Sequence, residues 1–146
     1  MRGLRKIGLE RARAAQVSRA LWKGLVNFNR EQAGPLCYKR EVISARDGKG
    51  RLLGGIILQS YLLETYVELL WLSEQARRAG LGGKLLSFAE RCARQRGSRH
   101  IHLNTYSFQA PRFYEKQGYR RFGVISGSPR GGSRHFYVKR LQSEGR

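Results

Sequence analysis

A glycine-rich stretch, Arg77-Arg78-Ala79-Gly80-Leu81-Gly82-Gly83-Lys84-Leu85-Leu86, follows directly on the apolar run Val67-Glu68-Leu69-Leu70-Trp71-Leu72. Together they predict a strand, a short turn and the start of a helix. Glycine lets backbone N–H groups approach a ligand closely, and the unpaired N–H groups of a helix start attract phosphates. The two arginines add fixed positive charge at the same place. This part of the chain therefore predicts a site for a diphosphate group.

Three phosphate-binding patterns compete for this stretch. A Walker loop needs glycine and a hydroxyl residue at two positions where this chain has Arg78 and Leu85. A dinucleotide fingerprint, Gly-x-Gly-x-x-Gly, also fails at Leu85. The pattern Arg/Gln-x-x-Gly-x-Gly/Ala is met in full by Arg77-x-x-Gly80-x-Gly82.

That third pattern resembles the coenzyme A pyrophosphate loop of the GCN5-related N-acetyltransferases (GNAT). A second block, residues 110–119, is similar to the Asn-x-x-Ala-x-x-aromatic-Tyr-x-x-x-Gly-aromatic block that follows the loop in this family. One position departs from the pattern, because Ser107 stands where the family has Asn. The run from Thr105 to Ala110 is similar to a bacterial GNAT subgroup of undefined substrate. The resemblance covers residues 17–141.

The resemblance implies a co-substrate, acetyl-CoA, and no metal. It also implies transfer of the acetyl group to a primary amine by direct attack. The implied pyrophosphate site consists of Arg77, Arg78, Ala79, Gly80, Leu81, Gly82 and Gly83. The pantothenate arm is expected to pair with the backbone of Leu70, Trp71 and Leu72, where the sheet of this family splays open. Further cofactor contacts are expected from Ser107 and Tyr114.

Two residues are candidates for catalysis. Tyr114 matches the family tyrosine near the coenzyme A sulfur, and a phenol can donate a proton to a leaving thiolate. Its alternative role is packing beside Phe113. Glu68 lies in an otherwise apolar strand, where some family members place the base that deprotonates the amine, often through water. Its alternative role is an ion pair with an arginine, because a carboxylate in such a strand needs a partner.

Other chemistry-bearing residues carry weaker signals. His100 and His102 share a face of one strand, but a metal site needs a third ligand and the sequence shows none nearby. Tyr106 and Phe108 are candidates for the wall of an acceptor pocket or for ordinary core aromatics. A metal site is therefore not expected, and the role of the two aromatic residues stays open.

The chain has 146 residues, the size of one ordinary domain, and 40% hydrophobic residues, enough for a core. No apolar stretch has the length of a membrane span, and the basic N-terminus lacks the apolar core of a secretory signal. We therefore expect a single GNAT-like domain over residues 1–146, a cytoplasmic location and no membrane partner. Residues 142–146 are expected to form a tail.

The net charge of the chain does not decide which class of amine accepts the acetyl group. Lys and Arg number 29 against 10 Asp and Glu, a net charge of +19, and such a field attracts polyanions. The first hypothesis is an N-acetyltransferase for the amine of a small molecule or a protein. The alternatives are an acyltransferase for an RNA-borne amine, such as aminoacyl-tRNA, and a nucleic-acid-binding GNAT-fold module without turnover. A homodimer is one possible assembly.

The hydrophobic pattern predicts an α/β or α+β fold around one mixed, splayed sheet flanked by helices. Residues 1–9 are a short first strand or a frayed end. Helices are expected at 10–29 and 81–96, with a short one from Pro111 to Gly118. Strands are expected at residues 36–46, 51–61, 65–72, 100–104, 119–126 and 133–140.

Overall fold

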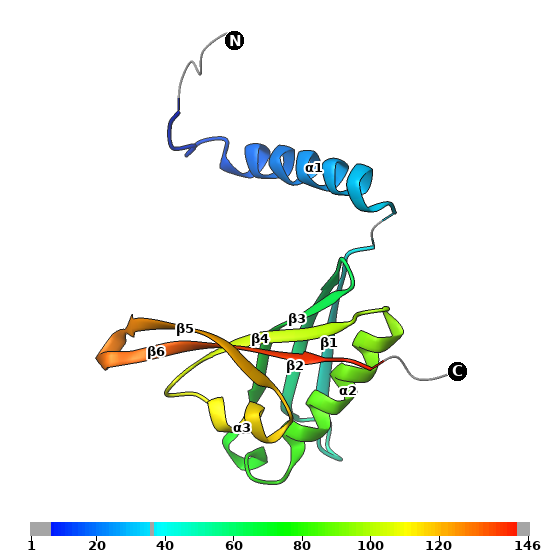
Figure 1. Ribbon diagram of the computed structural model, residues 1–146. Coiled ribbons are helices and arrows are strands. Elements are labelled where there is room, and N and C mark those ends of the chain that lie inside the picture. The colour runs from blue at the N-terminus through cyan, green and yellow to red at the C-terminus, as the bar shows by residue number, and fades with distance from the viewer. Residues whose placement is uncertain (1–6, 36, 143–146) are drawn as a thin grey trace. The chain divides into compact units, whose positions relative to one another are not determined.

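The structure is a computed structural model that describes residues 7–35 and 37–142, and these fall into two compact units divided at residue 36 (Figure 1). The prediction of one domain over residues 1–146 stays a prediction. Residues 7–9 form neither helix nor strand, and the remainder of the predicted first strand, residues 1–6, lies outside the described residues. Gln142 also lies outside the helices and strands, and the rest of the predicted tail, residues 143–146, is not among the described residues.

The first unit consists of helix α1, Ala14–Ala33, which begins later than the sequence predicted. It ends at Gly34, whose φ of 79° is a left-handed value and whose N–H donates to the Arg30 carbonyl. Its apolar residues recur at helical spacing, as predicted. No described helix is long and apolar enough to cross a membrane.

The second unit contains a six-stranded sheet in the order β1-β2-β3-β4-β6-β5. Strands β3 and β4 pair in parallel and the other neighbours pair antiparallel, so the predicted mixed sheet and α+β class are confirmed. The strands are β1 Lys39–Arg46, β2 Leu52–Tyr61, β3 Glu64–Leu72, β4 His100–Tyr106, β5 Arg120–Ser128 and β6 Gly132–Arg140. The helices are η1 Glu74–Ala76, α2 Leu81–Gln95, α3 Pro111–Lys116 and η2 Pro129–Gly131.

One hydrophobic core joins α2 and α3 to the sheet. From α2, Leu86, Ala89 and Ala93 are fully buried against strand residues such as Ile56 and Leu103. Burial of this apolar area is the main force that holds helix and sheet together. The same cluster includes three tyrosines: Tyr114, Tyr119 and Tyr137.

Gly54 and Gly55 were predicted to mark a bulge or a close backbone approach in the second strand, and the structure shows the close approach. A Cβ on Gly54 would stand 2.6 Å from the Trp71 carbonyl oxygen, and one on Gly55 would stand 2.7 Å from that of Ile43. Both distances are too short for a real side chain. The three strands β1, β2 and β3 can therefore pack only with glycine here.

The sheet opens between β3 and β4. Their parallel pairing covers only Glu64–His100, Thr65–Ile101 and Tyr66–His102, after which the two strands diverge. Among the described residues, β3 then pairs with β2 alone, and its register against β2 skips Glu68, which is a β-bulge. The predicted splay is therefore confirmed, and it lies directly before the glycine-rich turn.

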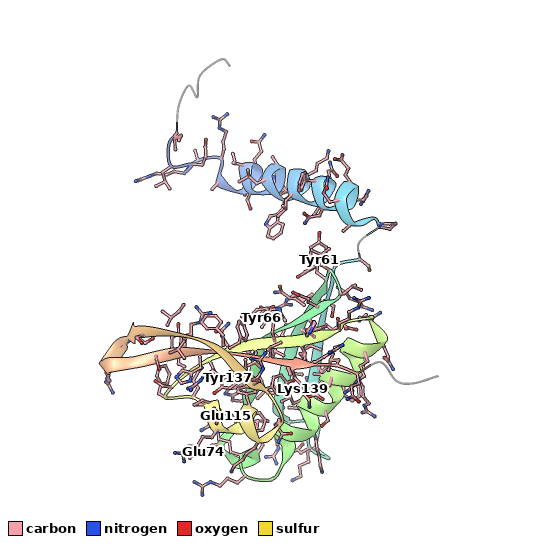
Figure 2. All side chains as sticks on the ribbon, in the orientation of Figure 1. Tyr61, Tyr66, Glu74, Glu115, Tyr137 and Lys139 are labelled. Atoms are coloured by element: carbon pink, nitrogen blue, oxygen red, sulfur yellow. The ribbon has the colours of Figure 1, made fainter. Side chains whose placement is uncertain are left out.

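Charged contacts fix strand β6 to the two helices that cover it. Lys139 donates to both carboxylate oxygens of Glu90 at 2.9 and 3.0 Å, and Tyr119 donates to the same carboxylate at 3.2 Å. On α3, Glu115 accepts a hydrogen bond of 2.9 Å from the Tyr137 hydroxyl (Figure 2). These contacts hold α3, which carries Tyr114, in place against the sheet.

Candidate active site

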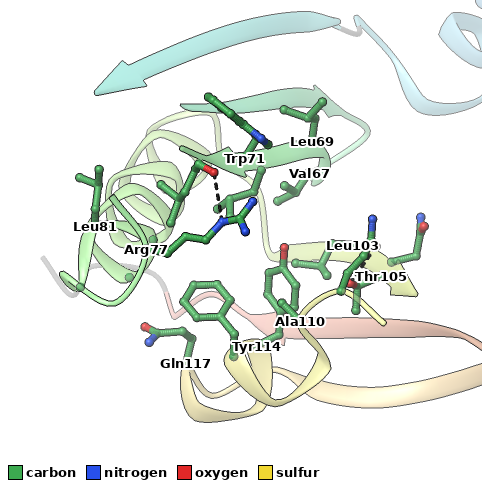
Figure 3. Close-up of a pocket in the computed structure, with 18 of the residues that line it drawn as sticks. Val67, Leu69, Trp71, Arg77, Leu81, Leu103, Thr105, Ala110, Tyr114 and Gln117 are labelled. Atoms are coloured by element: carbon green, nitrogen blue, oxygen red, sulfur yellow. Dashed lines mark hydrogen bonds between the residues drawn. The ribbon is translucent and has the colours of Figure 1, made fainter. Parts of the chain in front are cut away.

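A cavity of about 950 Å³ occupies the opening between β3 and β4 (Figure 3). Its walls come from the second half of β3, the glycine-rich turn, the first turn of α2, the end of β4 and α3. This volume suits a sizeable organic ligand. Most of the residues predicted for the site line it, namely Glu68, Leu70, Trp71, Leu72, Arg77, Arg78, Gly80, Leu81, Gly82, Gly83 and Tyr114.

One end of the cavity is the N-terminus of α2. Gly80 is the N-cap residue in a left-handed conformation, with φ 72°, and no side chain caps the helix. The first bond within the helix runs from the Lys84 N–H to the Gly80 carbonyl, so the N–H groups before Lys84 have no partner in the helix. The first turn also carries no acidic residue. This end therefore presents N–H groups and a positive helix terminus to an anion.

The two arginines of the turn stand beside this helix start. Arg78 has a left-handed φ of 71°, which is unusual for a residue other than glycine. The Arg77 Nε donates to the Leu72 carbonyl at 3.4 Å, and this bond links the turn to the end of β3 (Figure 3). Both side chains line the cavity and add positive charge to its phosphate-suited end.

The glycines of the turn have different roles. A Cβ on Gly82 would lie 3.2 Å from the Phe113 ring and 3.3 Å from the Leu72 side chain. Gly82 therefore lets α2 pack closely on β3 and α3, and a side chain there would have to displace the Phe113 ring and the Leu72 side chain by a few tenths of an ångström. A Cβ on Gly83 would lie 3.4 Å from the end of the flexible Gln117 side chain, which leaves room for a small side chain.

The wall formed by β3 offers free backbone groups. Beyond Tyr66 the strand has no neighbour on the β4 side, so its groups on that edge lack ladder partners. Leu70, Trp71 and Leu72 belong to this stretch and line the cavity, and the Leu72 carbonyl already accepts the Arg77 Nε hydrogen bond. An extended ligand with amide groups can add to such an edge as a strand does.

Tyr114 reaches the middle of the cavity from α3. The residue is 7% exposed, and its ring packs edge-on against Phe113 at a centroid distance of 5.0 Å. The hydroxyl points into the opening between β3 and β4 and has no hydrogen-bond partner among residues 7–35 and 37–142 (Figure 3). Burial raises the pKa of this phenol to about 12. The group therefore stays protonated at neutral pH, as a proton donor must.

Glu68 lies at the bulge in β3 and is tied to two neighbouring strands. Its carboxylate accepts hydrogen bonds from Arg40 Nε at 3.0 Å, Arg40 Nη2 at 3.1 Å and Gln59 Nε2 at 2.7 Å. The hydrogen bonds from Arg40, and then that from Gln59, lower the pKa of the carboxyl group. Glu68 is thus ionised and lines the cavity. Its lowered pKa makes it a weaker base, and its oxygens already accept three hydrogen bonds.

Two predicted cofactor residues lie outside the cavity wall: Ala79 and Ser107. Ala79 is exposed in the turn between two residues that do line the wall. The Ser107 hydroxyl accepts the Ser133 N–H at 3.1 Å, which places it against the start of β6. In the part of the chain that the structure describes, no group of three or more His, Cys, Asp or Glu side chains could hold a metal ion.

The cavity also has polar lining residues that the sequence did not single out: Asn104, Thr105, Gln109 and Gln117. Asn104 donates to the Tyr66 hydroxyl at 3.0 Å and accepts from Arg134 Nε at 2.8 Å. The available signal was their position near the second matched block: Asn104 and Thr105 lie on β4 before it, and Gln109 and Gln117 occupy unspecified positions inside it. Amides are common on protein surfaces, so this signal was weak.

One cavity thus contains a helix start suited to a diphosphate, an open strand edge and a buried tyrosine. Residues 38–121 match the family model described as an acetyltransferase (GNAT) domain, and the chain belongs to this family. It therefore uses acetyl-CoA, and it is an acetyltransferase.

The chain is similar to several characterised or solved proteins. Over 94 residues it is 39% identical to blasticidin-S acetyltransferase of Streptomyces morookaense, covering 64% of this chain and 69% of the relative. It is 29% identical over 127 residues to the acetyltransferase Atu2258 of Agrobacterium fabrum, covering 87% and 93%. The crystal structure of an acetyltransferase from Bacillus cereus superposes with a TM-score of 0.80 at 30% identity, covering 92% of this chain and 98% of that one.

Proposed function

We propose that this protein transfers the acetyl group of acetyl-CoA to a primary amine of a small molecule, by direct attack of the amine on the thioester. The observation that carries the proposal is the cavity between β3 and β4. It has an uncapped helix start at one end and the hydroxyl of Tyr114 at its middle. A site for an anion and a proton donor therefore share one cavity.

The residues present fit the parts of acetyl-CoA. The pyrophosphate would be held by the N–H groups at the start of α2 and by Arg77 and Arg78. The amide-containing arm would pair with the free edge of β3 at Leu70 and Trp71. This arrangement would direct the thioester toward Tyr114. Acetyl-CoA supplies the activated acetyl group, and the protein supplies its position.

The reaction forms an N–C bond and breaks a C–S bond, so the acceptor nitrogen must lose a proton and the departing sulfur must gain one. Tyr114 is our candidate for the second step, because its phenol is buried, protonated and free of other partners among the described residues. A neutral donor stabilises the developing thiolate without carrying charge in the ground state. Its packing contacts with Phe113 keep it in place.

Glu68 is our candidate for proton removal from the amine, acting through water. Its carboxylate is ionised and lines the cavity at a bulge, a feature found often beside active sites. The ion pair with Arg40 also fits a purely structural role. The pH profile of a Glu68 variant separates the two roles.

The acceptor is best supported as a small molecule. The relative that shares 39% identity carries a name that refers to blasticidin-S, which favours this class over a protein acceptor. None of the relatives reported above is named for an RNA-borne amine, so that alternative rests on the net charge of +19 alone. We therefore rank small-molecule amines first, protein amines second and charged tRNA third.

Release of free thiol from acetyl-CoA tests the proposal. The full-length protein is incubated with acetyl-CoA and a panel of small amines, peptides and charged tRNA, and thiol is measured against time. We expect release with small amines, and acetylation of the amine should match the released thiol in amount. Binding of acetyl-CoA without release for any acceptor would contradict an enzymatic role and support a binding module.

A further inference from the structure

We infer that Gln109 binds a carbonyl oxygen of acetyl-CoA and supplies the side-chain contact that Ser107, at the expected position, does not make. The inference rests on the proposed use of acetyl-CoA and names a further binding residue of that site. Gln109 occupies an unspecified position of the second family block, between Ser107 and Ala110. It follows strand β4, between Ser107 and the start of α3.

Ser107 is directed away from the cavity by its contacts. Its backbone N–H donates to the Ser133 carbonyl at 2.8 Å, and its hydroxyl accepts the Ser133 N–H at 3.1 Å. Both partners belong to the start of β6, and Ser107 does not line the cavity. Ser107 thus extends the β4–β6 contact. A neighbouring residue would have to make the cofactor contact that the resemblance leads us to expect from Ser107.

The amide of Gln109 has a fixed orientation. Its Oε1 accepts the Tyr106 N–H at 2.8 Å and the Thr105 hydroxyl at 3.1 Å. Because a backbone N–H can only donate, the amide atom that faces it must be the oxygen. Both acceptor positions of that oxygen are thereby used. The backbone N–H of Gln109 also donates to the Tyr106 carbonyl at 2.8 Å, and this hydrogen bond closes a tight turn from Tyr106 to Gln109.

The Nε2 group of Gln109 is consequently a free donor beside the cavity. It has no hydrogen-bond partner among the residues that the structure describes, and Gln109 is part of the cavity wall. Lining residues near it in sequence, Phe108 and Ala110, have no side-chain acceptor to offer. Gln109 is exposed, so water can satisfy this amide in the free protein, and a ligand atom that accepts hydrogen bonds can replace that water.

The chemistry of the donor favours a neutral carbonyl over a phosphate. An amide N–H carries no charge, whereas the charged and dipolar groups for the phosphates stand at the start of α2. The arm of acetyl-CoA contains amide carbonyls, as well as the thioester carbonyl. A carbonyl on the acceptor amine would present the same chemistry, so the experiment has one arm for each source.

The test compares two variants of Gln109 with a matched control. Gln109→Glu keeps oxygen acceptors for Tyr106 and Thr105 but removes both N–H donors. Gln109→Met removes the donors without adding charge, and Ser107→Ala is the control. In each full-length protein the melting temperature, the Kd for acetyl-CoA and the KM for an acceptor amine are measured. We expect acetyl-CoA to bind about tenfold more weakly to both Gln109 variants and within about twofold of wild type to the control.

Three results would overturn the inference. An unchanged Kd for acetyl-CoA in both folded Gln109 variants would show that the amide makes no contact with this ligand. An unchanged Kd with a raised KM for the amine would assign the amide to the acceptor. A loss of affinity in Ser107→Ala equal to that in Gln109→Met would restore the contact to position 107. If the wild-type protein itself failed to bind acetyl-CoA, the proposed function would fall together with this inference.

Discussion

Replacing Tyr114 by Phe removes one hydroxyl group and leaves the ring. The ring packs against Phe113, Tyr119 and Tyr137 at centroid distances of 5.0, 6.0 and 6.1 Å, and a Phe ring can keep these contacts. The hydroxyl has no partner among the described residues, so its removal leaves no protein group unsatisfied. We therefore expect the free energy of unfolding to change by less than about 1 kcal/mol at neutral pH.

The effect on turnover should be far larger. A lost proton donor typically costs between about 10- and 1000-fold in rate, and we expect kcat of Tyr114→Phe to fall within this range. The Kd for acetyl-CoA should stay within about threefold of wild type, because the hydroxyl acts on the leaving sulfur and not on the bound ground state. Steady-state kinetics by thiol release and calorimetric titration of acetyl-CoA measure the two quantities on the same preparations.

The pH dependence adds a second check. Burial raises the pKa of Tyr114 from 10.0 to about 12, so the donor should stay protonated to strongly alkaline pH. The folded-state pKa lies above the unfolded one, so this group stabilises the fold fully below about pH 10. That contribution is lost as pH rises through about 12. Alkaline unfolding should therefore be less steep in Tyr114→Phe than in wild type.

Wild-type kcat in a folded Tyr114→Phe variant would refute the assignment of Tyr114 as proton donor. A fall in kcat that is matched by an equal loss of acetyl-CoA affinity would also count against it. In that case the hydroxyl would serve binding in the ground state. Melting curves of both proteins at neutral pH show whether the comparison concerns two equally folded enzymes.

Three further substitutions test other parts of the structure. Glu68→Gln should lower kcat/KM most at acid pH, where the amine is protonated; a parallel drop at every pH, with a lower melting temperature, would leave Glu68 only its ion pair. Gly82→Ala should cost roughly 1–3 kcal/mol of stability in urea denaturation, because its Cβ would crowd Phe113 at 3.2 Å; unchanged stability would contradict the packing role of this glycine. Glu90→Gln should lower the free energy of unfolding by about 3 kcal/mol, since Lys139 would lose its carboxylate partner. A loss below about 1 kcal/mol would show that water solvates the lysine ammonium group in place of the carboxylate.

Local patterns in the sequence were enough to predict the order of the elements and the glycine-rich turn. Each depends on residues close together in the chain, such as the spacing of Arg77, Gly80 and Gly82. The boundaries were less accurate where pairing with distant strands decides them. Strand β4 continues to Tyr106, beyond the predicted end at Asn104, because Tyr106 pairs with Arg134 of β6.

The surroundings of the candidate catalytic residues depend on contacts that no local pattern contains. The partner of Glu68 is Arg40, 28 residues away, and their contact requires the register of three strands and a bulge. The orientation of Gln109 likewise depends on a turn that places its oxygen against the Tyr106 N–H. A sequence shows which residue types are available, whereas register and turn geometry decide which of them meet.

We propose that acetyl-CoA binds with its pyrophosphate at the start of α2. Gly83 is the residue at which to test it, because a side chain there would meet only the flexible end of Gln117, at 3.4 Å. Gly83→Asn adds the shape of a side chain, and Gly83→Asp adds the same shape with a negative charge. An acidic residue in the first turn suits the helix dipole, so both variants should fold.

Calorimetric titration of acetyl-CoA into wild type, Gly83→Asn and Gly83→Asp is therefore the most direct measurement. We expect a micromolar Kd for wild type, which corresponds to a binding free energy on the order of −8 kcal/mol. We expect Gly83→Asp to bind at least about tenfold more weakly than Gly83→Asn, and this difference should shrink at high salt. Equal affinities of the two variants would contradict the placement of the pyrophosphate, and absence of binding to wild type would contradict the account as a whole.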